Sequence, residues 1–158
     1  MAQSVPCEVV YADDCSTDDS LAIASSYPAL RVLPSAVHRG VCDARNRGAM
    51  ATTAPYIIFL DADDRLPPDF AAQTLADITP TAPFAFVRTG QFGVKEILWK
   101  TQPWDEYDLW RHNQVHTSAL WRRTAFDAAG RWQDDIPTMW DFDLSIRCAR
   151  YGMPVQSK

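Results

Sequence analysis

The 158-residue sequence lacks the features that mark several large classes of protein. No apolar run approaches the roughly 20 residues that a membrane-spanning helix needs. The N-terminus has no basic segment followed by an apolar one, which argues against a signal peptide. The net charge is −5 and no basic stripe is present to neutralise phosphates, so we expect no nucleic-acid partner.

The four cysteines show neither a CxxC pair nor the ligand spacing of a zinc finger. Such thiols are typical of a reducing compartment, so we expect a cytoplasmic protein whose cysteines stay reduced, some of them buried. They are Cys7, Cys15, Cys42 and Cys148.

Eleven prolines divide the chain into short segments. Up to residue 90, strand-like and helix-like segments alternate, which predicts an α/β fold with a mostly parallel sheet flanked by helices. We expect strands at 7–12, 30–33, 56–60 and 84–88, and helices at 16–27 (capped by Ser16), 41–52 and 67–77. Residues 91–112 show no clear pattern, and beyond them we expect a strand at 115–121 and helices at 123–129 and 141–151.

The most informative segment is the end of the strand expected at 56–60, where an apolar run passes into Asp61, Asp63 and Asp64. Ligands bind at the carboxyl ends of the strands of an open α/β sheet. Clustered carboxylates there repel each other unless a positive group holds them. A divalent cation with a phosphate on its far side satisfies this need, so we expect a cation site.

A second acidic pair, Asp13 and Asp14, follows the first expected strand. A turn followed by a helix cap explains this pair as well as a ligand site does. Because both strands end at the same edge of the sheet, the two acidic clusters should converge there.

A third acidic position is Asp141, which lies between Trp140 and Phe142 at the start of an expected helix. It is either a helix cap beside core aromatic residues or a base that takes a proton from a hydroxyl. The sequence leaves both interpretations open.

Arg45 and Arg47 precede the acidic strand, and either would neutralise a diphosphate, although most helical arginines are simply solvated. His116 is more typical of a structural histidine than of a catalytic one. The tryptophans are typical of a core, yet three of them would suit stacking on a sugar: Trp104, Trp110 and Trp140.

Four segments resemble, in the right order, motifs of the family 2 glycosyltransferases, which have the GT-A fold. Val9–Asp18 resembles VVDDGSTD, and Gly40–Gly48 resembles GxxxARNxG. Tyr56–Pro68 resembles YIxFLDADDxxxP, and Arg122–Arg147 resembles RR…GGF…EDxDLxxR. The resemblance implies one partial GT-A domain over 1–158, with a nucleotide-binding half at 1–90 and an acceptor-side half at 91–158.

The resemblance also implies transfer of a sugar from a UDP- or dTDP-sugar to an acceptor hydroxyl with inversion, as in polysaccharide biosynthesis. Asp14 would contact the base, Asp61 the ribose and Arg45 the nucleotide. Asp63 would bind Mg²⁺ or Mn²⁺, and Asp141 would be the general base. The acceptor would be a glycan, a lipid-linked sugar or a protein, and the resemblance leaves peripheral membrane association and a homo-oligomer open.

The sequence departs from the family pattern at several points. Family members usually begin with a strand and a helix, and we expect this chain to lack the strand and most of the helix, since Met1–Pro6 resembles the tail of that helix. We expect the missing strand to leave apolar sheet edges unpaired. The chain also ends early, Trp140 replaces the usual Glu before Asp141, and His38-Arg39 stands where an Asn is common. No QxxRW motif is present, which argues against a processive synthase.

Two other functions remain open at this point. The chain is alternatively a catalytically inactive nucleotide-binding or interaction module of the same fold. A nucleotidyltransferase or an aspartyl phosphatase also uses Asp-x-Asp chemistry, but no glycine-rich phosphate loop or lysine follows the first strand.

Overall fold

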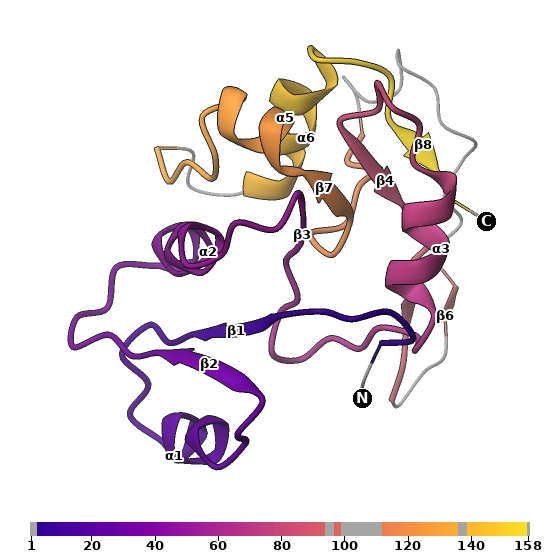
Figure 1. Ribbon diagram of the computed structural model, residues 1–158. Coiled ribbons are helices and arrows are strands. Elements are labelled where there is room, and N and C mark those ends of the chain that lie inside the picture. The colour runs from indigo at the N-terminus through magenta and orange to yellow at the C-terminus, as the bar shows by residue number, and fades with distance from the viewer. Residues whose placement is uncertain (1–2, 94–96, 99–111, 136–138, 158) are drawn as a thin grey trace.

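The computed structural model describes residues 3–93, 97–98, 112–135 and 139–157. Figure 1 shows the elements in chain order. They are β1 (Val9–Ala12), α1 (Ser20–Ser25), β2 (Leu30–Leu33), α2 (Val41–Met50), β3 (Tyr56–Ile58), α3 (Phe70–Asp77), β4 (Phe84–Phe86), β5 (Gly90–Gln91), β6 (Ile97–Leu98), β7 (Leu120–Arg122), α5 (Arg123–Ala128), α6 (Trp140–Ala149) and β8 (Val155–Gln156).

The predicted α/β class is confirmed, but the strands do not form one mostly parallel sheet. β1 and β2 form a parallel pair of their own, in which Val9 lies opposite Leu30. A second sheet has the order β3-β7-β4-β8, and in it β7 runs antiparallel to both β3 and β4. The alternation that predicted parallel strands stops at residue 90, and β7 follows the segment in which the sequence showed no pattern. A strand can pair with its neighbours in either direction, and antiparallel pairs are slightly more stable per residue.

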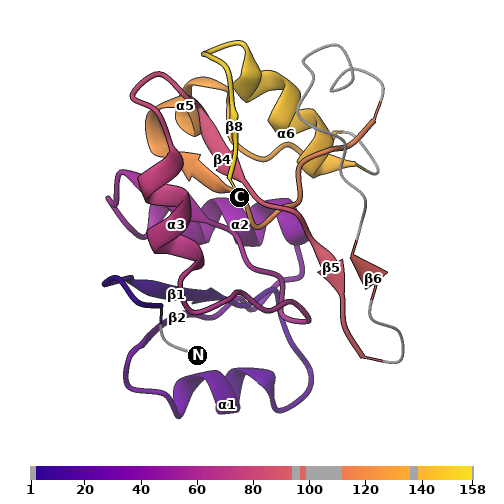
Figure 2. The ribbon, with the colours of Figure 1, turned by 90° about the vertical axis from the view of Figure 1, so that its right-hand side faces the viewer.

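The hydrophobic core lies around the second sheet. Phe84, Trp121, Phe126 and Leu144 are fully buried there, and the rings of Phe84 and Trp121 are 4.7 Å apart. Figures 1 and 2 show α5 and α6 beside β7, and α2 between this part of the molecule and β1. Helix α2 therefore connects the two sheets.

Two helices begin later in the chain than the sequence suggested. α1 begins at Ser20, not after a cap at Ser16, because the Asp13 carboxylate accepts the N–H groups of Cys15 and Ser16 at 3.1 and 3.2 Å and holds a turn. α3 begins at Phe70, since Pro67 and Pro68 precede the helix. No helix in the described ranges is long and apolar enough to cross a bilayer.

Residues of β1, α2 and β3 line a cavity of about 530 Å³. Within the described residues no strand lies between β1 and β3, so each presents one edge that is unpaired in a sheet. Side chains from all three elements line the cavity, among them Val10, Ala44 and Ile58. The unpaired sheet edges expected from the sequence are therefore present among the described residues.

Candidate functional site

The cavity beside β1 and β3 brings together the three residues that the sequence predicted to bind a nucleotide. Asp14 follows β1, Arg45 lies on α2 and Asp61 follows β3, and all three line the same cavity. β1 and β3 both end towards the first half of α2, because Asp14 contacts Gly40 before that helix and Asp61 contacts Arg45 within it. The two acidic strand ends therefore converge on one cavity, although β1 and β3 belong to different sheets and do not end at one sheet edge as predicted.

Arg45 is fixed on both sides. Its Nη2 donates to Asp61 Oδ1 at 2.7 Å, and its guanidinium lies 4.5 Å from the ring centroid of Trp132. The Arg45 side chain is only 11% exposed, and its buried Nε has no hydrogen-bond partner among the described residues. The arginine therefore presents a preorganised positive charge at the carboxyl end of β3.

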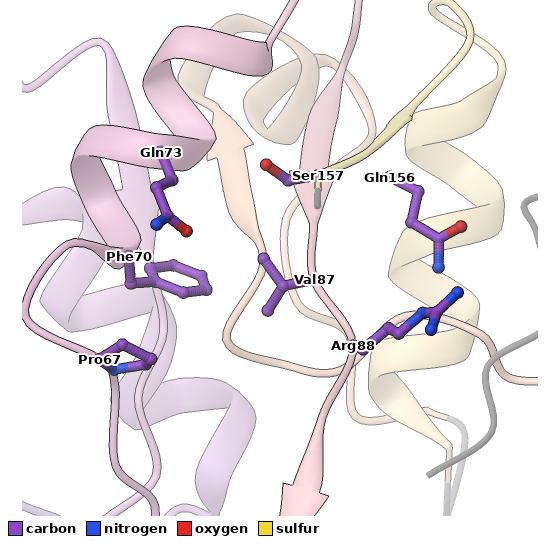
Figure 3. A pocket seen from close by; sticks show the side chains of 7 residues that line it. All are labelled: Pro67, Phe70, Gln73, Val87, Arg88, Gln156 and Ser157. Atoms are coloured by element: carbon purple, nitrogen blue, oxygen red, sulfur yellow. The ribbon is translucent and has the colours of Figure 1, made fainter. Parts of the chain in front are cut away.

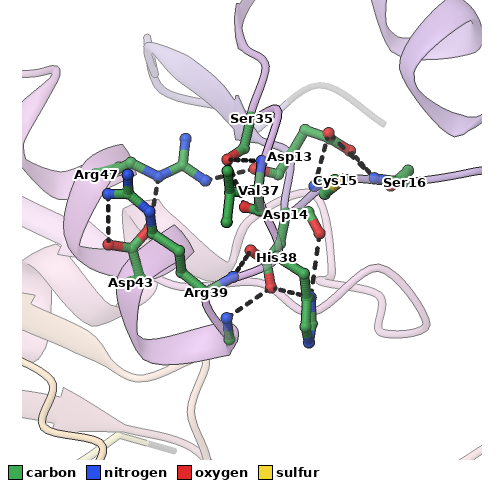
Figure 4. A network of polar contacts seen from close by, with 11 residues as sticks. Asp13, Asp14, Cys15, Ser16, Ser35, Val37, His38, Arg39, Asp43 and Arg47 are labelled. Atoms are coloured by element: carbon green, nitrogen blue, oxygen red, sulfur yellow. Dashed lines mark hydrogen bonds and ion pairs between the residues drawn. The ribbon is translucent and has the colours of Figure 1, made fainter.

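Asp14 holds the loop that leads into α2 (Figure 4). Its carboxylate accepts the N–H groups of Arg39 and Gly40 at 2.8 and 2.9 Å, and His38 Nδ1 lies 2.9 Å away. The hydrogen bond from Arg39 is the main cause that lowers the pKa of Asp14. The contacts that the structure gives to Asp14 are thus structural, and its role toward a nucleotide base stays a prediction.

Neighbouring polar residues have structural partners as well. Asp13 is 2% exposed. Its hydrogen bonds lower its pKa, and the one with Ser16 contributes most. Arg47 donates to Asp43 at 2.8 Å and to the Asp13 carbonyl, which joins α2 to the end of β1 (Figure 4). Of the two arginines singled out from the sequence, Arg45 reaches the acidic cluster and Arg47 stabilises the fold.

The acidic cluster after β3 forms a turn, in which the Asp64 N–H donates to the Asp61 carbonyl at 3.0 Å. Asp63 is exposed at this turn. Among the described residues, no group of three or more His, Cys, Asp or Glu side chains is placed to hold a metal. The carboxylates of this turn nevertheless suit Mg²⁺, which proteins commonly hold through one or two carboxylates together with phosphate oxygens and water.

The structure adds His116 to this cluster. Its Nε2 lies 3.6 Å from Asp64 Oδ2, while its Nδ1 is close to the Ser118 hydroxyl at 2.8 Å. The sequence favoured a structural histidine, and its pattern gave no signal for this contact because the two residues are 52 positions apart.

Asp141 lies in the first turn of α6. Its Oδ2 accepts from Asn113 Nδ2 and its Oδ1 from the Phe142 N–H, both at 2.9 Å. The helix cap is Met139, with φ of 68°, so the interpretation of Asp141 as the cap is wrong. Trp140 packs partly buried against the core, whereas Trp104 and Trp110 lie outside the described residues.

A second hollow of about 510 Å³ lies where β4 and β8 end beside the start of α3 (Figure 3). Its lining carries one positive charge and no carboxylate, so it offers no cation site. The lining residues are Pro67, Phe70, Gln73, Val87, Arg88, Gln156 and Ser157.

The fold, with acidic strand ends around one cavity, is that of the GT-A class of α/β proteins. The chain belongs to glycosyl transferase family 2, whose model matches residues 2–133. A mycobacterial relative, the PGL/p-HBAD biosynthesis glycosyltransferase of Mycobacterium bovis, is 30% identical over 157 residues, which cover 89% of this chain and 57% of the relative. The uncharacterised glycosyltransferase YibD of Escherichia coli is 32% identical over 137 residues, covering 79% of this chain and 37% of YibD.

Among solved structures, S. aureus TarS (residues 1–349, in complex with UDP) superposes with a TM-score of 0.80 at 16% identity. The match covers 98% of this chain and 50% of that of TarS. At this identity the likeness shows the fold. The chain spans little more than half the length of the mycobacterial relative, at 57%.

Proposed function

We propose that this chain is the donor-binding core of a metal-dependent, inverting glycosyltransferase that uses a UDP- or dTDP-sugar. The observation that carries the proposal is the cavity lined jointly by Asp14, Arg45 and Asp61 at the ends of β1 and β3. A nucleotide is anionic, and the guanidinium of Arg45 offers it a positive group that is already held in place. The proposed acceptor is the hydroxyl of a glycan, a lipid-linked sugar or a protein.

In the proposed reaction Asp141 takes the proton of the acceptor hydroxyl, whose oxygen attacks the anomeric carbon while the bond to the diphosphate breaks. A Mg²⁺ or Mn²⁺ ion held by Asp63 and the diphosphate would supply positive charge next to the leaving group. Arg45 remains paired with Asp61, so it orients the nucleotide without itself moving a proton.

A calorimetric titration of UDP with and without Mn²⁺ tests donor binding. UDP is the first probe because TarS was solved with it. We expect binding that requires the metal and that Asp63→Ala abolishes. Asp127→Ala is the matched control, because it removes an exposed carboxylate on α5 that pairs with Arg131.

Catalysis is tested separately from binding. We expect slow hydrolysis of a UDP- or dTDP-sugar that Asp141→Asn reduces to a small residual rate while UDP binding persists. If a folded sample binds neither UDP nor dTDP with Mn²⁺, the proposed function is wrong.

A second candidate is an inactive nucleotide-binding or interaction module of the same fold. The unpaired edges of β1 and β3 favour it, because an incomplete sheet next to the site loses backbone hydrogen bonds. Metal-dependent UDP binding with no hydrolysis of any tested sugar nucleotide would support this module over the enzyme.

A further inference from the structure

The residue next to the proposed base is Asn113, which lies on the segment that leads to β7. Its Nδ2 donates to Asp141 Oδ2 at 2.9 Å. We propose that Asn113 is a positioning residue that fixes the carboxylate of Asp141 for proton transfer. The proposal rests on the proposed function, because it assigns Asn113 a part in the same reaction.

The orientation of the Asn113 amide is determined by its two neighbours. Its Oδ1 accepts the Val115 N–H at 3.2 Å, which leaves the NH₂ group to face Asp141. An ionised carboxylate has only acceptor oxygens, so it requires the same orientation. A flipped amide would break both hydrogen bonds.

Asn113 is exposed, but its backbone is anchored close by. Val115, two residues later, is 1% exposed and belongs to the hydrophobic core. The hydrogen bond from the Val115 N–H therefore fixes the Asn113 amide relative to the core. This is how an exposed side chain can hold a fixed position.

The Asp141 carboxylate needs such a contact. The terminal torsion of an aspartate is broad, so the side chain does not fix the plane of its own carboxylate. The Phe142 N–H holds Oδ1 and Asn113 holds Oδ2, which occupies two of about four acceptor directions. The remaining directions are left for an acceptor hydroxyl.

The same segment also reaches the acidic cluster after β3. His116, three residues after Asn113, lies 3.6 Å from Asp64. The segment from 113 to 118 therefore contacts both the proposed base and the acidic cluster that would hold the metal. Through Asn113 it holds the base relative to that cluster.

Two substitutions separate positioning from folding. Asn113→Asp keeps an acceptor for the Val115 N–H but replaces the donor to Asp141 by a repelling oxygen, whereas Asn113→Ala removes both. With the fastest substrate among UDP-glucose, UDP-N-acetylglucosamine and dTDP-glucose, we expect kcat for hydrolysis to fall about tenfold or more in both variants, since small misplacements cost that much. We expect KM to stay within about twofold, because the donor does not contact Asn113 in this proposal.

The Asp141→Asn background decides whether Asn113 acts through the base. There, Asn113→Ala should cause no further loss, because residues that act as a unit are not additive. Losses that multiply, or a change in KM with kcat intact, would overturn the proposal.

A measurement without turnover keeps the two proposals distinguishable. In ¹⁵N-labelled protein the side-chain amide signals of Asn113, identified by their loss in Asn113→Asp, should shift strongly in Asp141→Ala. If they do not move, the contact is absent in solution and the positioning role is wrong, whatever the activity. If they move but no sugar nucleotide is hydrolysed, it is the proposed function that fails.

Discussion

The ion pair between Arg45 and Asp61 should contribute measurably to stability. The two atoms Nη2 and Oδ1 are 2.7 Å apart, and the side chains are 11% and 37% exposed. Exposed pairs contribute about 0 to 1 kcal/mol, whereas removing one partner of a buried pair costs about 3 to 5 kcal/mol. Because this pair is half-buried, we expect a coupling free energy of about 1 to 2 kcal/mol.

The two partners should not lose the same amount. Asp61→Asn removes the charge and keeps the shape, so we expect a loss of about 1 to 2 kcal/mol in the free energy of unfolding. Arg45→Met also removes the stacking on Trp132, where the guanidinium lies 4.5 Å from the ring centroid. That contact adds about 0.5 to 1 kcal/mol, so the arginine variant should be the less stable of the two.

A double-mutant cycle measures this coupling. Urea unfolding, followed by tryptophan fluorescence, gives the free energies of unfolding of the unchanged protein, the two single variants and the double variant. The control cycle uses Arg131 and Asp127, an i,i+4 pair at 2.8 Å whose side chains are 40% and 38% exposed. That exposed pair should show a coupling of only about 0.2 to 1 kcal/mol. If the losses of Arg45→Met and Asp61→Asn add in the double variant to within about 0.3 kcal/mol, the two residues are not coupled and the reasoning is refuted.

Three further predictions concern positions away from this pair. Hydrogen bonds lower the pKa of Asp14 from its usual 3.8. The ionised carboxylate therefore contributes its full stabilisation above pH 3.8 and loses it as the pH falls through the lowered pKa. Asp14→Asn should be less stable at pH 7 and show a shallower acid unfolding curve below pH 5. Gly152→Ala should lose about 2 to 3 kcal/mol in urea unfolding, since the new Cβ would lie 2.2 Å from the Thr81 carbonyl oxygen, whereas Gly93→Ala, also at positive φ but with open space around it, should lose less. Burial raises the pKa of Cys148 to about 12, so a thiol reagent at pH 8 should modify it only after unfolding, while the exposed Cys7 reacts in the folded protein; modification of Cys148 in the folded state would contradict its burial.

Local chemistry made most of the first ninety residues predictable. The strand at Leu30–Leu33 and the start of α2 at Val41 match the sequence expectation, since proline and glycine delimit both segments. The acidic ends of β1 and β3 were predictable for the same reason, because each is a short apolar run that stops at carboxylates. Their convergence was predicted from the rule that parallel strands end at one sheet edge, but β1 and β3 lie in different sheets, so that rule does not account for it.

Long-range contacts set the limit of that reasoning. The antiparallel pairing of β7 depends on where the chain returns after residue 112, and no local pattern specifies it. The contact between His116 and Asp64 and the hydrogen bond between Asn113 and Asp141 arise from this return. The sequence showed these residues as separate, so it could rank Asp141 as a base or a cap but could not identify its partner.

The two sheets hold the proposed site with different firmness. Asp61 and Asp64 follow β3, which pairs with β7 in the core-bearing sheet. Asp14 follows β1, whose second edge pairs with no other strand among the described residues and borders the cavity. Helix α2 contacts the end of β1 through the hydrogen bond from Arg47 to the Asp13 carbonyl and through Gly48, where a Cβ would lie 3.6 Å from Ala12. It contacts the residue that follows β3 through the ion pair of Arg45 with Asp61. Local opening occurs where few buried contacts resist it, so any loss of order at the unpaired edge should affect Asp14 before the acidic turn after β3.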